Sequence, residues 1–170
     1  IRAYGDRPVE REKLEAVIRA GNQAPIFGRL HMSVFAGPEQ LQAVDAAAVA
    51  GMARSGVPFL ENLAAQEGYH PLYGAAALVV LSAPGGLDEK GFNMANVSCA
   101  AENMLLAAAG LGLGSCFLMG PMAAFSDPAL RARLELPGGY EPLVGVALGY
   151  AALERPVAPE RTDAGITWCR

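Results

Sequence analysis

One stretch of the chain, residues 96–120, is far more apolar than its surroundings. Its first half, residues 96–110, consists of good helix formers with almost no polar residue after Asn103, which predicts a helix without a polar face. Closely spaced glycines then predict a helix C-cap and a turn, and the apolar residues 115–119 predict a buried strand. A helix without a polar face has to be covered on all sides, so we expect it at the centre of a core or an interface.

The rest of the pattern alternates between helical and strand periods. Leu14, Val17 and Ile18 form one apolar stripe on a charged helix that should open around Pro8 and end near Gly21. Continuous apolar runs predict strands that are buried on both faces, and residues 85–91 are expected to form a surface loop. The predicted elements are helices at 39–53, 58–66 and 127–134, the last capped by Ser126 or Asp127, and strands at 32–36, 75–82 and 143–150.

The composition adds a reason to expect a large interface. Hydrophobic residues make up 52% of the 170 residues, enough for a single domain over 1–170 with a sizeable core. Residues 104–125 carry no charge and are long enough for a membrane span. Glycines and Pro121 interrupt that run, however, and no Lys/Arg cluster flanks it, which favours a subunit interface over a span. A net charge of −4 without a basic block argues against nucleic acid as a partner.

The chain carries few residues suited to catalysis by the protein alone. Its three cysteines lack metal-site spacing, and Cys99 and Cys116 are expected in apolar surroundings, which predicts no metal site and a cytoplasmic protein. The glycines at 110, 112 and 114 follow a helix and do not match a dinucleotide-binding fingerprint, and hydrolase and P-loop motifs are absent from the sequence. Any redox or transfer chemistry is therefore expected to come from a cofactor.

Five segments, in order along the chain, carry a resemblance to a known family. They are IRAYGDRPVEREKLEAVIRAGNQAP at 1–25, PLYGAAALVVLSAP at 71–84, ENMLLAAAGLGLGSCF at 102–117, LPGGYEPLVGVALGY at 136–150, and Arg161. Together they resemble the nitroreductase family, which uses flavin mononucleotide (FMN). The resemblance implies an α+β, three-layer α/β/α sandwich with a mostly antiparallel central sheet, assembled as an intertwined homodimer with FMN at the interface. It also implies hydride transfer from NADH or NADPH, through flavin N5, to a nitroaromatic, a quinone or a similar small acceptor.

The same resemblance assigns residues to the cofactor. Arg2 corresponds to a basic residue at the flavin N1/O2 edge, and Arg161 to a residue that binds the FMN phosphate. Residues 118–120 correspond to a segment whose backbone runs beside flavin N5 and O4. Counting the loop at 24–33, the implied cofactor-binding residues are Arg2, Pro25, Ile26, Phe27, Arg29, His31, Leu118, Met119, Gly120 and Arg161. No side chain is implied as an obligatory acid or base, and Asn103 is expected to satisfy buried backbone groups.

Two departures from the family pattern keep a second hypothesis open. The loop at 24–33 reads APIFGRLHMS, without the polar residues usual in the family, and Pro159 stands where a lysine usually accompanies Arg161. The alternative is therefore a degenerate member that keeps the fold and the dimer but binds another ligand, or none. A membrane-associated helical protein is the third hypothesis. Because the chain starts at Ile1, we also expect native residues that precede it.

Overall fold

The computed structural model describes residues 1–85, 90–152, 165 and 167–169. Its described part contains a four-stranded sheet in the order β1-β2-β4-β3. Every neighbouring pair is antiparallel, with β2 irregular between Leu81 and Ser82 where it pairs with β4. The strands are β1 (His31–Phe35), β2 (Ala77–Pro84), β3 (Gly114–Leu118) and β4 (Tyr140–Gly149).

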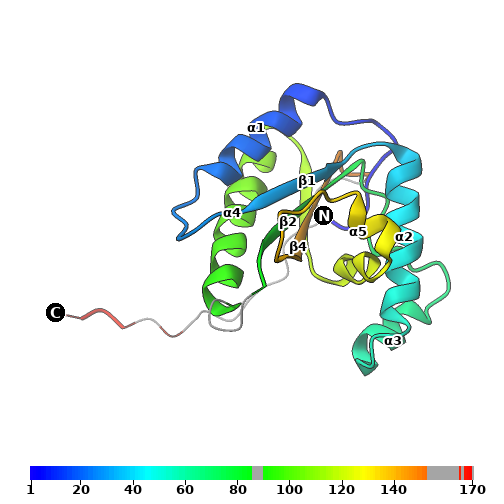
Figure 1. The fold of residues 1–170 in the computed structure, drawn as a ribbon. Helices are drawn as coiled ribbons and strands as arrows, with labels where there is room; N and C mark the ends of the chain where they lie inside the picture. The colour runs from blue at the N-terminus through cyan, green and yellow to red at the C-terminus, as the bar shows by residue number, and fades with distance from the viewer. Residues whose placement is uncertain (86–89, 153–164, 166, 170) are drawn as a thin grey trace.

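Helices cover both faces of this sheet. On one face lie α1 (Arg11–Asn22) and α4 (Lys90–Gly110); on the other lie α2 (Pro38–Met52), the 3₁₀ helix η1 (Gly120–Ser126) and α5 (Pro128–Ala132) (Figure 1). The helix α3 (Pro58–Ala64) has no buried residue and stands at the edge of the molecule, next to α2 (Figure 1). The predicted three-layer α/β/α sandwich is thus confirmed.

The central strand β2 divides the interior into two cores. Leu78 and Val80 pack into the core beneath α2, whereas Val79 and Leu81 pack into the core beneath α1 and α4. Alternate side chains of a strand point to opposite faces, so a strand with apolar residues at every position can supply both cores. The prediction that this segment is buried on both faces is confirmed.

Several boundaries differ from the prediction for local reasons. The first helix begins at Arg11, with Glu10 at its N-cap and Pro8 outside it. The helix α4 begins at Lys90, so residues 90 and 91 of the predicted loop at 85–91 belong to the helix instead. The sequence pattern did not predict η1. Pro121 lies in its first turn, where backbone N–H groups have no partner within the helix, so proline, which has no N–H, costs no hydrogen bond there. Asp127 caps α5 as expected, since its Oδ1 accepts the N–H groups of Ala129 and Leu130 at 2.8 and 3.1 Å.

The apolar helix α4 is covered on one side only. Its inner face is buried against α1 and the sheet, and Asn103 donates to the carbonyl of Ala20 on α1 at 3.2 Å, the backbone role expected of it. Its outer face carries exposed residues three and four positions apart, which we call the α4 stripe: Phe92, Ala95, Cys99, Glu102, Leu106 and Ala109. Cys99 is exposed in a single copy of the chain, so its expected apolar surroundings are not found there, and coverage of α4 by a subunit interface stays a prediction. No helix in the described part of the chain has both the length and the hydropathy of a membrane span.

Candidate functional site

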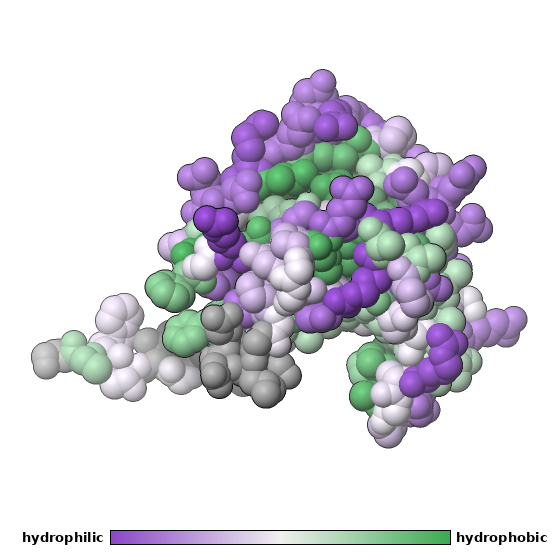
Figure 2. Space-filling view, viewed as in Figure 1, coloured by the Kyte–Doolittle hydropathy of each residue, from purple (hydrophilic) through white to green (hydrophobic). Residues whose placement is uncertain are grey.

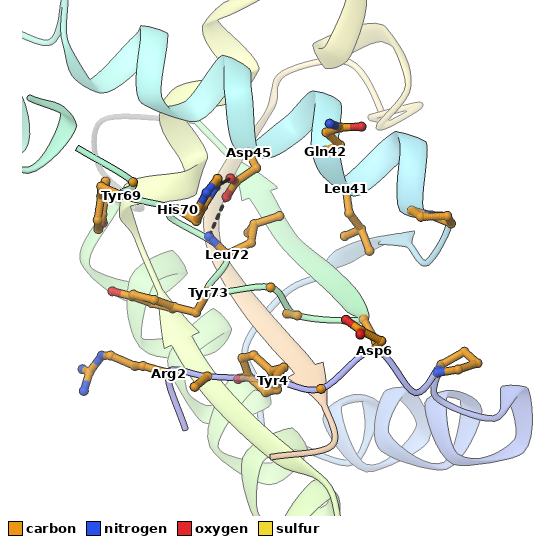
Figure 3. Close-up of a pocket in the computed structure, with 18 of the residues that line it drawn as sticks. Arg2, Tyr4, Asp6, Leu41, Gln42, Asp45, Tyr69, His70, Leu72 and Tyr73 are labelled. Carbon is orange, nitrogen blue, oxygen red and sulfur yellow. Dashed lines mark hydrogen bonds and ion pairs between the residues drawn. The ribbon is translucent and has the colours of Figure 1, made fainter. Parts of the chain in front are cut away.

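An open cavity of about 1060 Å³ lies on the α2 side of the molecule. Three parts of the chain form it: residues 2–8, the first half of α2, and residues 66–76, which lead into β2 (Figure 3). Its volume lies just above the range that is usual for small-molecule and cofactor sites, about 300–1,000 Å³. Its lining combines aromatic rings with a few charged groups, which suits a flat, partly charged ligand.

The N-terminal wall of the cavity is tied to the end of β4. Tyr4 pairs with Ala151 as an isolated antiparallel bridge, and the N–H of Gly5 donates to the carbonyl of Tyr150 at 2.9 Å. The Tyr4 ring is buried beneath this segment, its hydroxyl donates to the carbonyl of Ile1 at 3.0 Å, and burial raises the pKa of that hydroxyl. These contacts hold the backbone around Arg2, whose exposed side chain extends along the cavity wall (Figure 3).

The opposite wall is fixed by a carboxylate on α2. Asp45 accepts the N–H of Leu72 on Oδ1 at 2.8 Å, and its Oδ2 lies 2.7 Å from Nδ1 of His70. The turn that follows places Tyr73 at a φ of 55° and Gly74 at a φ of 75°, a left-handed backbone that costs a non-glycine residue such as tyrosine free energy. Asp45 thus secures the turn that carries the histidine.

Two tyrosines flank His70 in sequence and meet edge to face. The rings of Tyr69 and Tyr73 have their centroids 6.4 Å apart at an interplanar angle of 83°. Burial, together with the neighbouring Tyr73, raises the pKa of Tyr69 to about 12, so the Tyr69 hydroxyl stays a neutral donor near pH 7. Tyr69, Tyr73 and Arg2 extend toward the same side of the cavity (Figure 3), where a flat ligand could meet aromatic edges and a guanidinium together.

The loop at 24–33 lies away from this cavity, against α4. Asn96 of α4 accepts the N–H of Phe27 at 3.1 Å and donates to its carbonyl at 2.5 Å, while the Phe27 ring itself is 85% exposed. His31 has its Nε2 3.0 Å from the carbonyl of Leu134, which also accepts the hydroxyl of Ser33 at 2.8 Å. None of the predicted loop residues Pro25, Ile26, Phe27, Arg29 and His31 lines the cavity.

The remaining predicted residues are placed elsewhere again. Leu118 ends β3 and is buried, Met119 is 57% exposed, and Gly120 begins η1; the cavity includes none of them. Arg161 lies outside the described residues. Among the predicted residues that the structure describes, Arg2 alone reaches the cavity, and the others form two separate groups.

The family resemblance places Tyr69, His70 and Tyr73 where the substrate pocket varies, but sequence reasoning assigned none of the three a role. Tyr69, His70 and Tyr73 show no periodic pattern, since they lie in an irregular segment. Asp45 could have been noticed in the sequence, because it is the only charged residue in the Ala-rich run 43–53. Asn96 left a comparable signal as an amide at the start of an apolar stretch. What neither signal could supply was the partner, which lies 25 residues away for Asp45 and 69 for Asn96.

With the fold and the cavity described, comparisons with known proteins place the chain. The chain belongs to the nitroreductase family, since the family profile described as Nitroreductase family matches residues 1–150. A protein of Archaeoglobus fulgidus provisionally named NADH dehydrogenase/NAD(P)H nitroreductase is 30% identical over 160 residues, which cover 91% of this chain and 82% of that protein.

Solved structures agree with this assignment. A nitroreductase from Bacteroides fragilis with bound FMN is 29% identical, has a TM-score of 0.85 and is matched over 100% of this chain and 93% of its own. A second FMN-bound nitroreductase, from Desulfitobacterium hafniense, is 24% identical with a TM-score of 0.85 over 99% and 92% of the two chains, and supports the fold.

Proposed function

We propose that this protein is a homodimeric, FMN-dependent oxidoreductase that takes hydride from NADH or NADPH and reduces a small acceptor such as a nitroaromatic or a quinone. The observation that carries the proposal is the position of Arg2 in an open cavity with an aromatic lining. FMN is present in the Bacteroides fragilis relative, and the Archaeoglobus fulgidus relative is named for NADH and NAD(P)H. When bound, FMN would supply hydride chemistry at its N5.

The residues of the cavity fit such a group. The Arg2 guanidinium is exposed and has no hydrogen-bond partner among the described residues. It is therefore available to bind the N1/O2 edge of the flavin, which gains negative charge on reduction. The rings of Tyr69 and Tyr73 offer apolar edges beside it. The family resemblance assigns the backbone of Leu118, Met119 and Gly120 to the flavin as well, although these residues lie outside the cavity of one chain. A Cβ at Gly120 would meet only ordinary contacts, to Met52 at 3.5 Å, so the chain itself does not require glycine at this position.

A second copy of the chain would complete the site. The α4 stripe repeats at the three- and four-residue spacing of helices that pack on a partner helix, and its Phe92 and Leu106 are 69% and 63% exposed. Phe27 and Met119 are exposed as well, each in a segment that the family resemblance assigns to the flavin. Pairing through α4 would cover the exposed side chains of the α4 stripe.

One observation favours a second candidate, a family member that binds another ligand or none. In the loop at 24–33, Phe27 uses both backbone groups on Asn96, and His31 uses Nε2 on Leu134. These groups are therefore engaged within the chain, whereas the family pattern offers free polar side chains at this point. The two candidates share the fold and the dimer and differ in flavin affinity.

Spectroscopy of the purified protein separates the two candidates. The proposal expects a yellow protein with one FMN per chain that bleaches anaerobically with NADH or NADPH. Arg2→Ala should slow flavin reduction more than it lowers thermal stability, while Arg11→Ala, an exposed arginine on α1, serves as the matched control. A colourless, folded dimer that refuses added FMN would support the second candidate. Equal loss of flavin reduction and stability in Arg2→Ala would remove Arg2 from the site.

A further inference from the structure

We propose that residues 56–68, which include α3, form a lid that swings about Gly56 and Gly68 and closes over the cavity when a flat aromatic ligand binds there. In the closed position Phe59 packs on the ring of that ligand. We call residues 56–68 the lid segment. The inference rests on the proposed function only for the choice of the test ligand, a nitroaromatic, and it adds the part of the chain that encloses it.

The lid segment is weakly attached to the rest of the molecule. None of its residues, all of which the structure describes, is buried, and α3 packs against α2 at the edge of the fold (Figure 1). Within the described part of the chain, its hydrogen bonds are local: Gly56 donates its N–H to Glu61 at 3.0 Å, and Val57 donates to Ser55 at 3.2 Å. A segment with no buried residue and only local hydrogen bonds can leave its position while the core stays folded.

The chain on either side of the lid segment is fixed. Before it, α2 ends at Met52, which is fully buried, and a Cβ at Gly51 would overlap the carbonyl of Ala123 in η1. After it, the carboxylate of Asp45 on α2 accepts the N–H of Leu72 at 2.8 Å. Both anchors belong to the packed body of the molecule, so a movement of the lid segment has to take place between them.

A glycine stands at each end of the lid segment. Gly56 and Gly68 both have a φ of 71°, and a Cβ at either position would meet no atom within 4 Å. Glycine adopts positive and negative φ with little difference in free energy, and the open space around both residues leaves room for the backbone to turn. Lids move about a few residues of this kind at the ends of the moving element, so these glycines are suited to act as hinges.

The lid segment lies within reach of the cavity. Its last residues, Gln66, Glu67 and Gly68, already line the cavity wall. The seven residues of α3 are about 10 Å long, and a cavity of about 1060 Å³ is roughly 10 Å wide, so a swing of α3 can carry its first turn across the opening. Phe59 lies in that turn and is 68% exposed, and Val57 just before it is exposed as well. These side chains would give the closed lid an apolar surface toward an aromatic ligand.

Hydrogen exchange followed by mass spectrometry tests the closure. The probe is 4-nitrobenzoate, a flat nitroaromatic anion, added at saturation to the oxidised protein loaded with FMN. We expect the amides of the lid segment to exchange about 10-fold or more slowly with the probe, together with those of residues 69–76 of the cavity wall. The amides of α1, on the other face of the sheet, should stay within about twofold as the internal control. Slower exchange in residues 69–76 with no change in the lid segment would overturn the inference.

Phe59→Ala tests the contact between the lid and the ligand. Without the ring, we expect 4-nitrobenzoate to bind about 10-fold more weakly, because apolar area that the closed lid would bury is lost. At saturating probe, the slowing of exchange should disappear from the lid segment of the variant and persist in residues 69–76. Val34→Ala, which also shortens an exposed apolar side chain but on β1, is the matched control and should bind within about twofold of wild type. Equal affinity of Phe59→Ala and wild type would overturn the role of Phe59.

The outcomes separate the lid from the proposed function. A protein that holds FMN and bleaches with NADH or NADPH, but whose lid segment exchanges equally fast with and without 4-nitrobenzoate, overturns the lid alone. A protein that takes up no FMN overturns the proposed function. The same exchange experiment on that flavin-free protein then decides the lid, since slower exchange of the lid segment supports closure and unchanged exchange overturns it. If Phe59→Ala does not fold, exchange in the wild type decides the question by itself.

Discussion

Helices α1 and α4 pack against each other on the same face of the sheet, yet their outer surfaces differ in kind. Around α1 the exposed residues form ion pairs, with Arg7 2.6 Å from Glu10 and Arg11 2.8 Å from Glu15. Hydrophilic side chains accordingly cover α1 in Figure 2. The outer face of α4 instead carries the α4 stripe, whose Phe92 and Leu106 are exposed. Both helices bury their inner faces in one core, so the difference concerns only what each presents outward.

The comparison teaches that two helices can bury their inner faces in one core and still differ in what their outer faces are suited to meet. Surface ion pairs contribute little stability, about 0–1 kcal/mol each. The charged residues of α1 therefore matter mainly because they keep this surface well solvated. The α4 stripe, in which Glu102 is the charged member, leaves the apolar area of Phe92 and Leu106 in water until another surface covers it. We therefore regard α1 as an outer surface of the assembled protein and α4 as the proposed seam between copies.

The largest expected effect comes from a charge in the α4 stripe. Leu106→Arg would replace an apolar side chain of the proposed seam by a guanidinium that has to be desolvated there, and we expect dimer dissociation to become about 100- to 1,000-fold more favourable. Flavin should be lost together with the dimer. Sedimentation velocity over a concentration series measures this, and Arg11→Ala on α1 is the control that should stay dimeric. A Leu106→Arg protein that remains dimeric with bound flavin would move the seam away from α4.

A smaller effect is expected on the inner side of the same helix. Met104 is fully buried where α4 meets α1, and a Cβ at Gly21 would lie 2.9 Å from its Cγ. Met104→Ala should lower the free energy of unfolding by about 2–5 kcal/mol through lost burial and a cavity. Urea denaturation of the Leu106→Arg background would measure this without the dimer. A change below about 1 kcal/mol would mean that α1 and α4 collapse onto the vacated space.

The smallest expected effect concerns the polar attachment of α1. Tyr150 donates to Oε2 of Glu10 at 2.6 Å and accepts from Nζ of Lys13 at 2.8 Å, while the Arg7 guanidinium lies 4.0 Å above its ring. The hydrogen bond from Tyr150 is the main cause that lowers the pKa of Glu10 from 4.5 to about 2. A depressed carboxyl pKa adds stability above about pH 4.5, and that stability is lost as pH falls toward 2.

Tyr150→Phe should therefore lower Tm by a few degrees at pH 7, where the Glu10 carboxylate is charged in both states. The difference from wild type should shrink as the pH is lowered through the range between 4.5 and about 2. Because Glu10 is well exposed, solvent screening keeps the effect small. Thermal melts of both proteins at pH 7, 4 and 2.5 test this. A Tm difference that stays constant with pH would show that the lost packing of the ring, and not Glu10, causes it.

Elements with a regular period could be predicted, and side-chain partnerships could not. The strand at 75–82 was found by its continuous apolar run, and the Asp127 cap by residue type at a helix start. The predicted flavin residues followed the family resemblance, and the structure places them in three separate regions of one chain. Nothing local in the sequence indicates that Asp45 meets His70, or that Asn96 holds Phe27, because these contacts join different elements.

The sequence alone determined where most of the helices and strands form, since backbone geometry repeats every 3.6 or 2 residues and apolar side chains must follow that repeat to be buried. It also determined that one helix would be too apolar to face water all round. Only the tertiary structure decided which side of α4 stays exposed and which charged groups meet in the cavity. The physical reason is that these outcomes depend on how separate elements pack in three dimensions, and packing is set by side-chain shape across the whole core rather than by neighbours in sequence.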